Sequence, residues 1–550
     1  MQFWQTDSEQ YVREQYRRPK RTEQVIYSGE TRVARESDLK DVLHGDSPVR
    51  LEGATLLLED PDSRGTRFQP TIGDIHLSLE DHTIVTGSTG SGKSERFIMP
   101  AIISILKHSP ETIIHVVDFK QSLGPRLNFL VNHYRPWEQF GYLNFTDIRR
   151  SRAISLLCEV NDIQSAMRFS TEICKSIGLN EDNPFWRLSS EDLLSGLFMI
   201  CRRLDSVATM AEVRRILKLG VGEFKKWAQQ HHELDPTGSV KRFADFLSGG
   251  SHNAETIMQT AANAFIIFLD NAIAQLTGRR DLSIEQMVSR PGGVFLFETP
   301  ETDAKRLEPL TNIVNDLITE YRLKPDNHRV PMVRVIDELN LMGTVTDLPI
   351  RLNTFRERNT TIIAAQQSLS QLHSRYGVEA SDVLAAFKNK VFLSPCSYSD
   401  AELASGESGL ITVETHQADG AIINAGSPIV RPLLLPEEIV RPPEHPASGR
   451  PATFFLGHRQ PFQALLAPAW EALAGRELPI PDRPVQEPVD RFDQNFLDTD
   501  SDNGTGDSSD TETTTAPPSE YQPELFEDQS EHGAAEHDTD LFDPPDDLDW

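Results

Sequence analysis

Short runs of apolar residues alternate with helical patterns in two regions of the chain. These runs are rich in Val, Ile, Phe and Thr without polar alternation, which is typical of parallel strands buried on both faces. Helices between them, as predicted for residues 303–323, indicate an α/β fold with a mostly parallel, three-layer sheet. Alternating runs over residues 50–80 predict a small β-rich segment ahead of the first buried strand. The buried runs are Ile84-Val85, TIIHVVDF (112–119), YLNFTD (142–147), GGVFLFET (292–299), MVRVIDEL (332–339), TTIIAAQQ (360–367) and KVFLSP (390–395).

Residues 155–285 carry a different pattern, in which apolar side chains recur at helical spacing. The segments DLLSGLFMICRRL and AETIMQTAANAFIIFLDNAIAQL show it, and strand-like runs are scarce. The pattern predicts an all-α domain inserted into the α/β core. Its basic pairs, of which Lys241-Arg242 is one, belong either to a solvated helical face or to a surface that contacts phosphates.

The loop after the first buried strand has the sequence G-x-x-x-x-G-K-S. Its glycines allow consecutive backbone N–H groups to curl around phosphate oxygens, and the helix that follows adds a positive dipole end. The lysine can reach the β- and γ-phosphates, and the serine hydroxyl can bind Mg²⁺. We therefore expect a P-loop NTPase that binds ATP and Mg²⁺. The residues expected around the phosphates are Gly87, Ser88, Thr89, Gly90, Ser91, Gly92, Lys93 and Ser94.

A second motif, VRVIDE, places Asp337 and Glu338 at the carboxyl end of a predicted strand. In phosphate-loop enzymes the first acid of such a pair holds Mg²⁺, and an acid directly after it can orient and deprotonate the attacking water. An acidic pair at a strand end is common by itself, but a preceding phosphate loop makes it more specific. We predict Ser94 and Asp337 as metal ligands, Glu338 as the general base, and Lys93 as the lysine that stabilises charge on the phosphates.

Five further residues flank the predicted strands. Arg356 can neutralise charge on a γ-phosphate bound to a neighbouring subunit, which requires an oligomer, most naturally a ring. The alternative, which also applies to Arg358, is a surface ion pair. The Gln367 amide either senses the γ-phosphate or makes a strand-end hydrogen bond. Asp118 and Lys120 belong either to the ligand crevice at the carboxyl edge of the sheet or to an ion pair there.

Charge is unevenly distributed, because residues 481–550 hold 22 acidic and 2 basic side chains and so −20 of the net charge of −29. The remaining body is only mildly acidic, which leaves local basic surfaces for a nucleic-acid partner. The tail is rich in Asp, Glu, Ser, Thr and Pro and is expected to be disordered. The four cysteines show no metal-ligand spacing and are predicted to be reduced core residues. No signal peptide or bilayer-length apolar run is recognisable, so a cytoplasmic location is expected.

These patterns predict five parts of the chain. The sequence from residue 420 to 480 is rich in proline and is expected to be irregular and to lie along the domain surface. The parts are a polar N-terminal arm (1–48), the first part of a nucleotide-binding domain (49–154), the all-α domain (155–285), the second part of the nucleotide-binding domain (286–465) and the acidic, disordered tail (466–550).

The sequence resembles the type IV coupling proteins of bacterial conjugation and type IV secretion (TraD/TraG-type) from about residue 70 to residue 460. The phosphate loop is generic, whereas the blocks IDELNLMG and AAQQSLSQLHSRYG, in this order around a helical insertion, are more specific. The matching segments are IGDIHLSLEDHTIVTGSTGSGKS, HVVDFKQSL, NPFWRLSSEDLLSGL, VRVIDELNLMG, FRERNTTIIAAQQSLSQLHSRYG, NKVFLSP and RPLLLPEEI.

The resemblance implies a RecA-like motor with an all-α domain, assembled as a homo-hexamer around a DNA channel. Such rings hydrolyse ATP to move DNA, with its relaxase, to a secretion channel. The resemblance supports the roles of Lys93, Ser94, Asp337 and Glu338, with Arg356 and Gln367 as in-trans finger and nucleotide sensor. It implies DNA, relaxosome proteins and the ATPases of a type IV secretion channel as partners. Two features depart from the family: no N-terminal membrane anchor is recognisable, and the usual D-P-K-G-E block reads D-F-K-Q-S at residues 118–122.

Because of the missing anchor, we expect the inner membrane to be reached through secretion-channel ATPases or a separate anchor protein. The acidic tail carries Phe526, Leu541, Phe542 and Trp550, which predict a docking peptide for a relaxosome protein, or else a solubilising tail. Two other functions remain open at this point. One is a cytosolic HerA/FtsK-like translocase or helicase, and the other is a nucleotide-switched adaptor for protein substrates.

Overall fold

The computed structural model describes residues 22–26, 31–59, 68–135, 140–175, 184–204, 209–249, 252–324, 326–327, 329–342, 345, 347–416, 429–442, 449–473 and 475–483. The chain divides into two compact units, Met1–Pro488 and Val489–Trp550. The second unit, with the four tail residues expected to anchor a docking peptide, lies outside the described residues, so the disorder predicted for that part of the tail stays a prediction.

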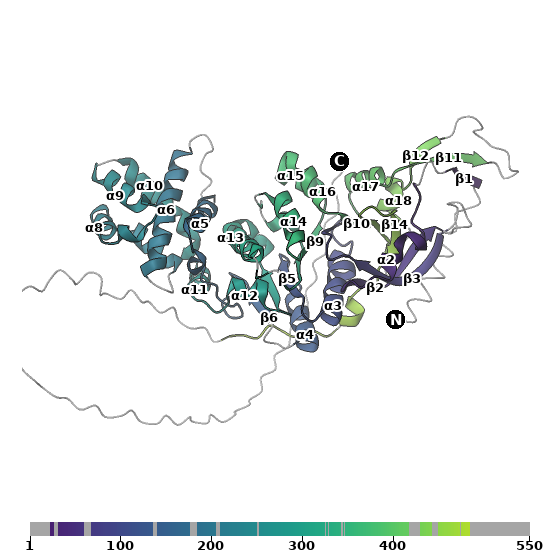
Figure 1. The fold of residues 1–550 in the computed structure, drawn as a ribbon, viewed down its shortest axis with the longest axis horizontal. Helices are drawn as coiled ribbons and strands as arrows, with labels where there is room; N and C mark the ends of the chain where they lie inside the picture. The colour runs from purple at the N-terminus through teal and green to yellow at the C-terminus, as the bar shows by residue number, and fades with distance from the viewer. Residues whose placement is uncertain are drawn as a thin grey trace, which may run out of the picture. The chain divides into compact units, whose positions relative to one another are not determined.

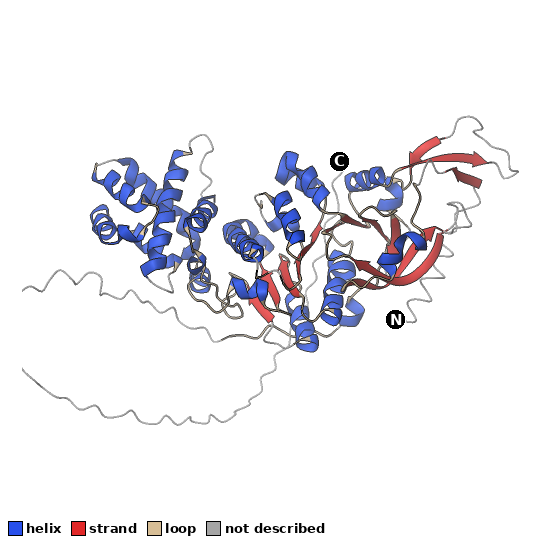
Figure 2. Ribbon diagram, viewed as in Figure 1, coloured by secondary structure: helices blue, strands red, loops and turns tan. Residues whose placement is uncertain are grey.

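An eleven-stranded sheet organises the described part of the first unit (Figures 1 and 2). Seven neighbouring strands are parallel, as predicted, and the remaining four continue the sheet in antiparallel pairing. In spatial order the strands are β3 (Phe68–Leu77), β2 (Val49–Glu59), β14 (Phe462–Leu465), β13 (Ala452–Leu456), β10 (Asn389–Leu393), β4 (Thr83–Thr86), β9 (Thr360–Gln366), β8 (Met332–Ile336), β5 (Ile113–Asp118), β7 (Val294–Glu298) and β6 (Phe140–Leu143).

The central strands are buried on both faces because successive side chains point into two different cores. On β8, for example, Val333 and Val335 pack into one core and Met332 and Ile336 into the other. One face carries α3 (Met99–His108), α4 (Gly124–Tyr134) and α19 (Trp470–Leu473). The other carries α12 (Ile284–Ser289), α13 (Ala304–Leu323), α14 (Leu348–Glu357), α15 (Ser370–Tyr376), α16 (Ala380–Ala386), α17 (Tyr398–Glu407) and α18 (Pro436–Val440). This is the predicted three-layer arrangement (Figure 1).

The stretch from residue 420 to 480 differs from the irregular surface segment that was expected. It contains β13 and β14, whose residues are almost all buried. These two strands join β10 to β2 within the main sheet. Most of the prolines that favoured an irregular segment precede β13, at positions 428–451 of the sequence. A shorter sheet is formed by β1 (Thr22–Ile26), β11 (Leu410–His416) and β12 (Ile429–Pro432).

Segments assigned to the two predicted tails also pack on this sheet. Residues 36–43 form the short helices η1 (Glu36–Leu39) and α2 (Lys40–Leu43), and their apolar side chains are buried against β3. After residue 466, the Ala469 N–H donates to the Glu95 carbonyl over 2.8 Å and the Leu478 N–H to the Pro125 carbonyl over 3.1 Å. Both segments therefore belong to the packed fold where they are described. The predicted domain boundaries themselves stay predictions.

The described residues between 155 and 289 are mostly helical, as the apolar spacing indicated. The helix α6 is surrounded by its neighbours, and ten consecutive or nearly consecutive residues of it are buried. The elements are η4 (Leu157–Glu159), α5 (Ile163–Lys175), α6 (Phe185–Leu204), α7 (Met210–Leu217), α8 (Val221–His231), η5 (His232–Leu234), α9 (Ser239–Ser248), α10 (His252–Ala264), η6 (Phe265–Leu269), α11 (Asn271–Thr277) and α12.

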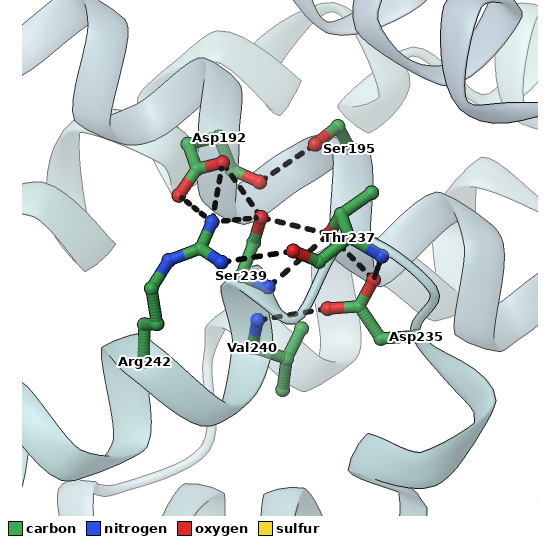
Figure 3. A network of polar contacts seen from close by, with 7 residues as sticks. All are labelled: Asp192, Ser195, Asp235, Thr237, Ser239, Val240 and Arg242. Atoms are coloured by element: carbon green, nitrogen blue, oxygen red, sulfur yellow. Dashed lines mark hydrogen bonds and ion pairs between the residues drawn. The ribbon is translucent and has the colours of Figure 1, made fainter.

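A polar network joins α6 to the start of α9 (Figure 3). The Asp235 carboxylate accepts the Val240 N–H over 2.9 Å and so caps α9, while Ser239 donates to Asp192 on α6 over 2.6 Å. Arg242 also contacts the Asp192 carboxylate, over 3.1 Å. The arginine of this basic pair is therefore bound to a carboxylate of its own domain.

A fully buried arginine, Arg322 at the end of α13, ties this helix to the amino edge of the sheet. Its guanidinium donates to one hydroxyl and to four backbone carbonyls, one in α12, two in the loop between α13 and β8 and one before β9, which leaves it well satisfied. The acceptors are Thr360 Oγ1 and the carbonyl oxygens of Val288, Asn327, Val330 and Asn359.

Two sequence expectations concern cysteines and membrane spans. The four cysteines are free and buried, as predicted, and burial raises the pKa of the Cys174 and Cys396 thiols to about 12. Within the described ranges, no single helix has the length and apolar character needed to cross a bilayer. The segments 253–269 and 271–277 meet that test only when they are counted together across a 95° bend.

Candidate nucleotide-binding site

The phosphate loop lies at the carboxyl edge of the sheet. It connects β4 to the π-helix η2 (Lys93–Ile98), which continues into α3. Neighbouring strands hold its first two residues. The Gly87 N–H donates to the Gln366 carbonyl at the end of β9 over 3.2 Å, and the Ser88 N–H donates to the Pro395 carbonyl after β10 over 2.8 Å. The loop is therefore anchored to both strands that flank β4.

Two glycines of this loop adopt backbone conformations that other residues rarely take. Gly90 has φ of 80° and Gly92 has φ of 89°. A Cβ atom on Gly92 would lie 2.4 Å from the Nε of Arg96, whose buried side chain packs against the loop. Arg96 donates to the Ser91 carbonyl and, over 3.0 Å, to the Arg450 carbonyl. The sequence pattern did not single out Arg96, because an arginine in the first turn of a helix carries no signature of such a role.

The Lys93 ammonium folds back over this loop. Its Nζ donates to the Gly87 carbonyl over 2.5 Å and lies 3.4 Å from the Ser88 carbonyl. Burial lowers the pKa of Lys93; the Glu338 carboxylate opposes this shift, and the Lys120 ammonium adds to it. The loop thus carries a buried positive charge at the position where the phosphate chain is expected.

Asp337 and Glu338 face the loop from the end of β8. The Asp337 N–H donates to the Val117 carbonyl on β5 over 3.0 Å, and this fixes the acidic pair between β5 and β9. The Ser94 hydroxyl donates to Asp337 Oδ1 over 2.9 Å. The structure therefore brings the two predicted metal ligands together, although they are 243 positions apart in the sequence.

The Glu338 carboxyl group is buried beside Asp337, and its side chain is not satisfied. Within the described chain neither of its oxygens has a hydrogen-bonding partner of ordinary geometry. Burial raises the pKa of Glu338 to about 7, although the ammonium groups of Lys93 and Lys120 act to lower it. The backbone of Gln367 also lowers this pKa and has the smallest effect on it. A carboxyl group with this pKa is charged in part of the molecules at neutral pH, which suits a general base.

These residues fit a nucleotide with its metal ion. A hydroxyl and a carboxylate oxygen meet at hydrogen-bonding distance, two loop glycines have positive φ, and the unpartnered oxygens of Glu338 point to a missing ligand. Hard oxygen ligands of this kind suit Mg²⁺, which keeps several waters and needs few protein ligands. No group of three or more His, Cys, Asp or Glu side chains in the described residues could hold a metal ion by itself.

Comparison with known proteins decides the family. The family model described as "Type IV secretory system Conjugative DNA transfer" matches residues 53–446. The chain belongs to this conjugative DNA transfer family. No curated protein sequence matches the chain significantly.

Solved structures of the bacterial conjugative coupling protein TrwB resemble this family member in fold. The unbound monoclinic form has a TM-score of 0.55 at 21% identity, covering 71% of this chain and 85% of TrwB. The complex with the GTP analogue GDPNP has a TM-score of 0.54 at 20% identity, covering 76% and 94%. The complex with ADP and Mg²⁺ has a TM-score of 0.53 at 19% identity, also covering 76% and 94%. The likeness confirms the predicted RecA-like NTPase fold.

In this conjugative transfer protein, Asp118 and Lys120 have separate positions. The Asp118 carboxylate accepts the N–H groups of Lys120 and Leu123, each over 2.9 Å, and so shapes the loop before α4. Burial raises the pKa of Asp118 to about 6, and the Asp337 charge adds to this. The Lys120 ammonium instead lies 3.3 Å from Asp337 Oδ2. Lys120 thus fits both interpretations left open by the sequence. It lies at the carboxyl edge of the sheet, where the ligand crevice is expected, and it forms an ion pair there.

Gln367 directly follows β9, half-buried, with its backbone close to Glu338. A residue that the sequence did not indicate, Asp400 at the start of α17, fixes the loop after it. The buried Asp400 carboxylate accepts the Leu369 N–H over 3.0 Å and the hydroxyl of Thr86, at the end of β4, over 2.8 Å. It thereby couples the phosphate-loop strand to the expected sensor loop. Neither proximity assigns a role to Gln367, which stays a prediction.

Arg356 does not join these residues within one chain. It is exposed at the end of α14, before β9 begins, and it lies close enough to His82 to contribute to that residue's lowered pKa, which burial mainly causes. His82 precedes β4, so Arg356 lies at the amino edge of the sheet, opposite the phosphate loop. The neighbouring Arg358 is half-buried at the same edge. A role of Arg356 at a neighbour's nucleotide stays a prediction.

Proposed function

We propose that the protein is an ATP-driven DNA translocase that couples a DNA-processing complex to a type IV secretion channel during conjugation. The observation that carries this proposal is the carboxyl-edge site. There the phosphate loop with Lys93 faces the Ser94–Asp337 pair and the buried Glu338, in a chain of the conjugative DNA transfer family. The TrwB structures with GDPNP, with ADP and Mg²⁺, and with ADPNP support a nucleotide as the ligand.

The residues of this site have complementary roles in ATP hydrolysis. Lys93 and the loop N–H groups bind the β- and γ-phosphates and stabilise the charge that develops on them. Glu338 in its charged form accepts a proton from the attacking water, and Gln367 contacts the γ-phosphate or this water. Ser94 and Asp337 would hold Mg²⁺, which when bound neutralises phosphate charge and orients the phosphate chain.

Arg356 completes the proposed reaction in an oligomer. Because it lies at the amino edge of the sheet, it reaches a nucleotide only if this edge abuts the carboxyl edge of the next subunit. Head-to-tail contacts of this kind close into a ring, and we propose a homo-hexamer around DNA. The ring would cycle between subunits because each one depends on its neighbour's arginine for turnover.

The partners of the proposed translocase are DNA, relaxosome proteins and components of the secretion channel. We place it in the cytoplasm and at the inner membrane through channel ATPases or a separate anchor protein. The acidic tail is the proposed docking peptide for a relaxosome protein. A chain that ends at residue 483 should lose this protein in a pull-down and keep its ATPase rate. Undiminished retention would contradict the docking role.

The central experiment measures the ATPase rate with and without DNA, together with particle mass. We expect DNA to stimulate the wild-type rate and a Lys93→Ala variant to lose both nucleotide binding and plasmid transfer. Lys107→Ala is the matched control, since Lys107 pairs with Glu52 over 2.9 Å in the last turn of α3, at the end of that helix away from the phosphate loop. A monomer that hydrolyses no ATP in the presence of DNA would contradict the proposal, and so would unaffected transfer with Lys93→Ala.

A further inference from the structure

The Lys120 side chain lies against the carboxylate that is expected to hold the metal ion. Its Nζ is 3.3 Å from Asp337 Oδ2, while Oδ1 of the same carboxylate accepts the Ser94 hydroxyl. The Asp337 side chain has no exposed surface, whereas that of Lys120 is 36% exposed. One buried carboxylate is thus shared between a predicted metal ligand and an ammonium group that reaches it from the solvent side.

The backbone that carries Lys120 is fixed. The Asp118 carboxylate holds the Lys120 and Leu123 N–H groups, and Gln121 between them has φ of 55°, a conformation that few side chains adopt. The Lys120 side chain has four rotatable bonds and is partly exposed to solvent. The ammonium group can therefore leave Asp337 without any change in the loop.

Charge around Asp337 explains why an ammonium group lies there. The neighbouring Asp118 and Glu338 carboxyl groups are both buried, and the other ammonium of the site, on Lys93, binds the carbonyls of the phosphate loop. A buried carboxylate without a partner is strongly unfavourable. Lys120 is the described cation that pairs directly with Asp337.

We propose that Lys120 is a resident counter-ion of Asp337 that competes with Mg²⁺ for this carboxylate. The inference rests on the proposed function, because it takes Asp337 as a metal ligand. A divalent cation at Asp337 and Ser94 would lie within a few ångströms of the ammonium group, and the two positive charges repel each other. Lys120 therefore stabilises the metal-free site, and metal binding requires its side chain to leave. It is a positioning residue, and its exchange with Mg²⁺ links nucleotide occupancy to the loop before α4.

The test measures Mg²⁺ dependence rather than turnover. Full-length wild-type, Lys120→Gln and Lys120→Arg chains bind a fluorescent ADP analogue, first in EDTA and then with increasing Mg²⁺. We expect Lys120→Gln to lower the apparent Kd for Mg²⁺ about three- to tenfold, because the competing charge is gone. The same variant should have a lower Tm than wild type in EDTA and regain it with Mg²⁺ and ADP. Lys120→Arg, which keeps the charge, should behave like wild type.

Lys107→Gln is the control, since it breaks a Lys–Glu pair in the last turn of α3, away from the phosphate loop, and should not change the Mg²⁺ dependence. An unchanged Kd for Mg²⁺ in Lys120→Gln overturns the proposal, whether or not the Tm falls. Weaker nucleotide binding in EDTA with unchanged Mg²⁺ dependence also overturns it, because Lys120 would then be a phosphate ligand. Failure of the proposed function looks different: the wild-type chain itself would bind no nucleotide.

Discussion

Replacing Glu338 with glutamine should stop ATP turnover and at the same time stabilise the nucleotide-free protein. Both effects come from the same buried carboxyl group, which has no hydrogen-bonding partner of ordinary geometry among the described residues. As a charged base it accepts the proton of the attacking water, and loss of a general base lowers a rate about 10²–10⁴-fold. As a buried charge it destabilises the native state, and the amide of glutamine keeps its shape without the charge.

The magnitude follows from the pKa of Glu338, which burial raises from 4.5 to about 7. One pKa unit equals about 1.4 kcal/mol, so the charged form is disfavoured in the native state by up to about 3 kcal/mol. Because the native state holds this proton more tightly than the unfolded chain, the contribution to stability is complete below about pH 4.5. It is lost as the pH rises through about 7. We therefore expect Glu338→Gln to be more stable to unfolding than wild type by about 1–3 kcal/mol at pH 8, and by about 1 kcal/mol or less at pH 5.

Thermal unfolding of the two chains without nucleotide, at both pH values, measures this difference. The wild-type ATPase rate should also rise with pH through about 7, because the base works in its charged form. A Glu338→Gln chain that gains no stability at pH 8, or gains the same amount at pH 5, would refute the assignment of the buried charge. Retained turnover in this variant would remove Glu338 as the base.

Three further substitutions test other parts of the site and the fold. Arg356→Ala should lower the DNA-stimulated ATPase rate about 10³-fold without changing nucleotide affinity, and mixing it with Glu338→Gln subunits should restore part of the rate; a mixture without any recovery would contradict an in-trans arginine. Gly92→Ala should weaken binding of a fluorescent nucleotide at least tenfold, because its Cβ would collide with Arg96; unchanged affinity would show that the loop adapts. Arg322→Leu should lower the free energy of unfolding in urea by about 3 kcal/mol or more, because it leaves buried carbonyl groups unpaired, and a change below about 1 kcal/mol would refute that account.

The phosphate loop and the acidic pair were predictable because each is a short motif of contiguous residues. A G-x-x-x-x-G-K-S loop specifies its own backbone, and Asp337 follows an apolar run that could only be a buried strand. Parallel strands place their carboxyl ends at one edge, so the meeting of Ser94 with Asp337 follows from the predicted fold. Six of the seven parallel strands were predicted because each contains a largely apolar run; for the seventh, β6, the predicted segment 142–147 overlaps the strand Phe140–Leu143 only at its end.

What the sequence did not reveal depends on contacts between distant segments. The strands β13 and β14 are four or five residues long and are bordered by Pro and Gly, so local composition favoured an irregular segment. Asp400 has no motif around it, and its role arises only because Thr86 and Leu369 meet it in space. Which carboxylate Lys120 pairs with depended on a side-chain direction that strand ends do not encode.

The pairing of β14 with β2 has a consequence for how the protein is made. The register pairs Leu57 with Gln463, so β2 pairs with a strand that is synthesised about 400 residues later. During translation, β2 and β3 can form a hairpin early, but they cannot join the large sheet until the ribosome has passed residue 465. A nascent chain released at residue 446 would contain every residue predicted to contact phosphates, yet the edge of β10 that pairs with β13 in the complete protein would be exposed. Quality-control proteases should therefore remove such fragments faster than the complete polypeptide.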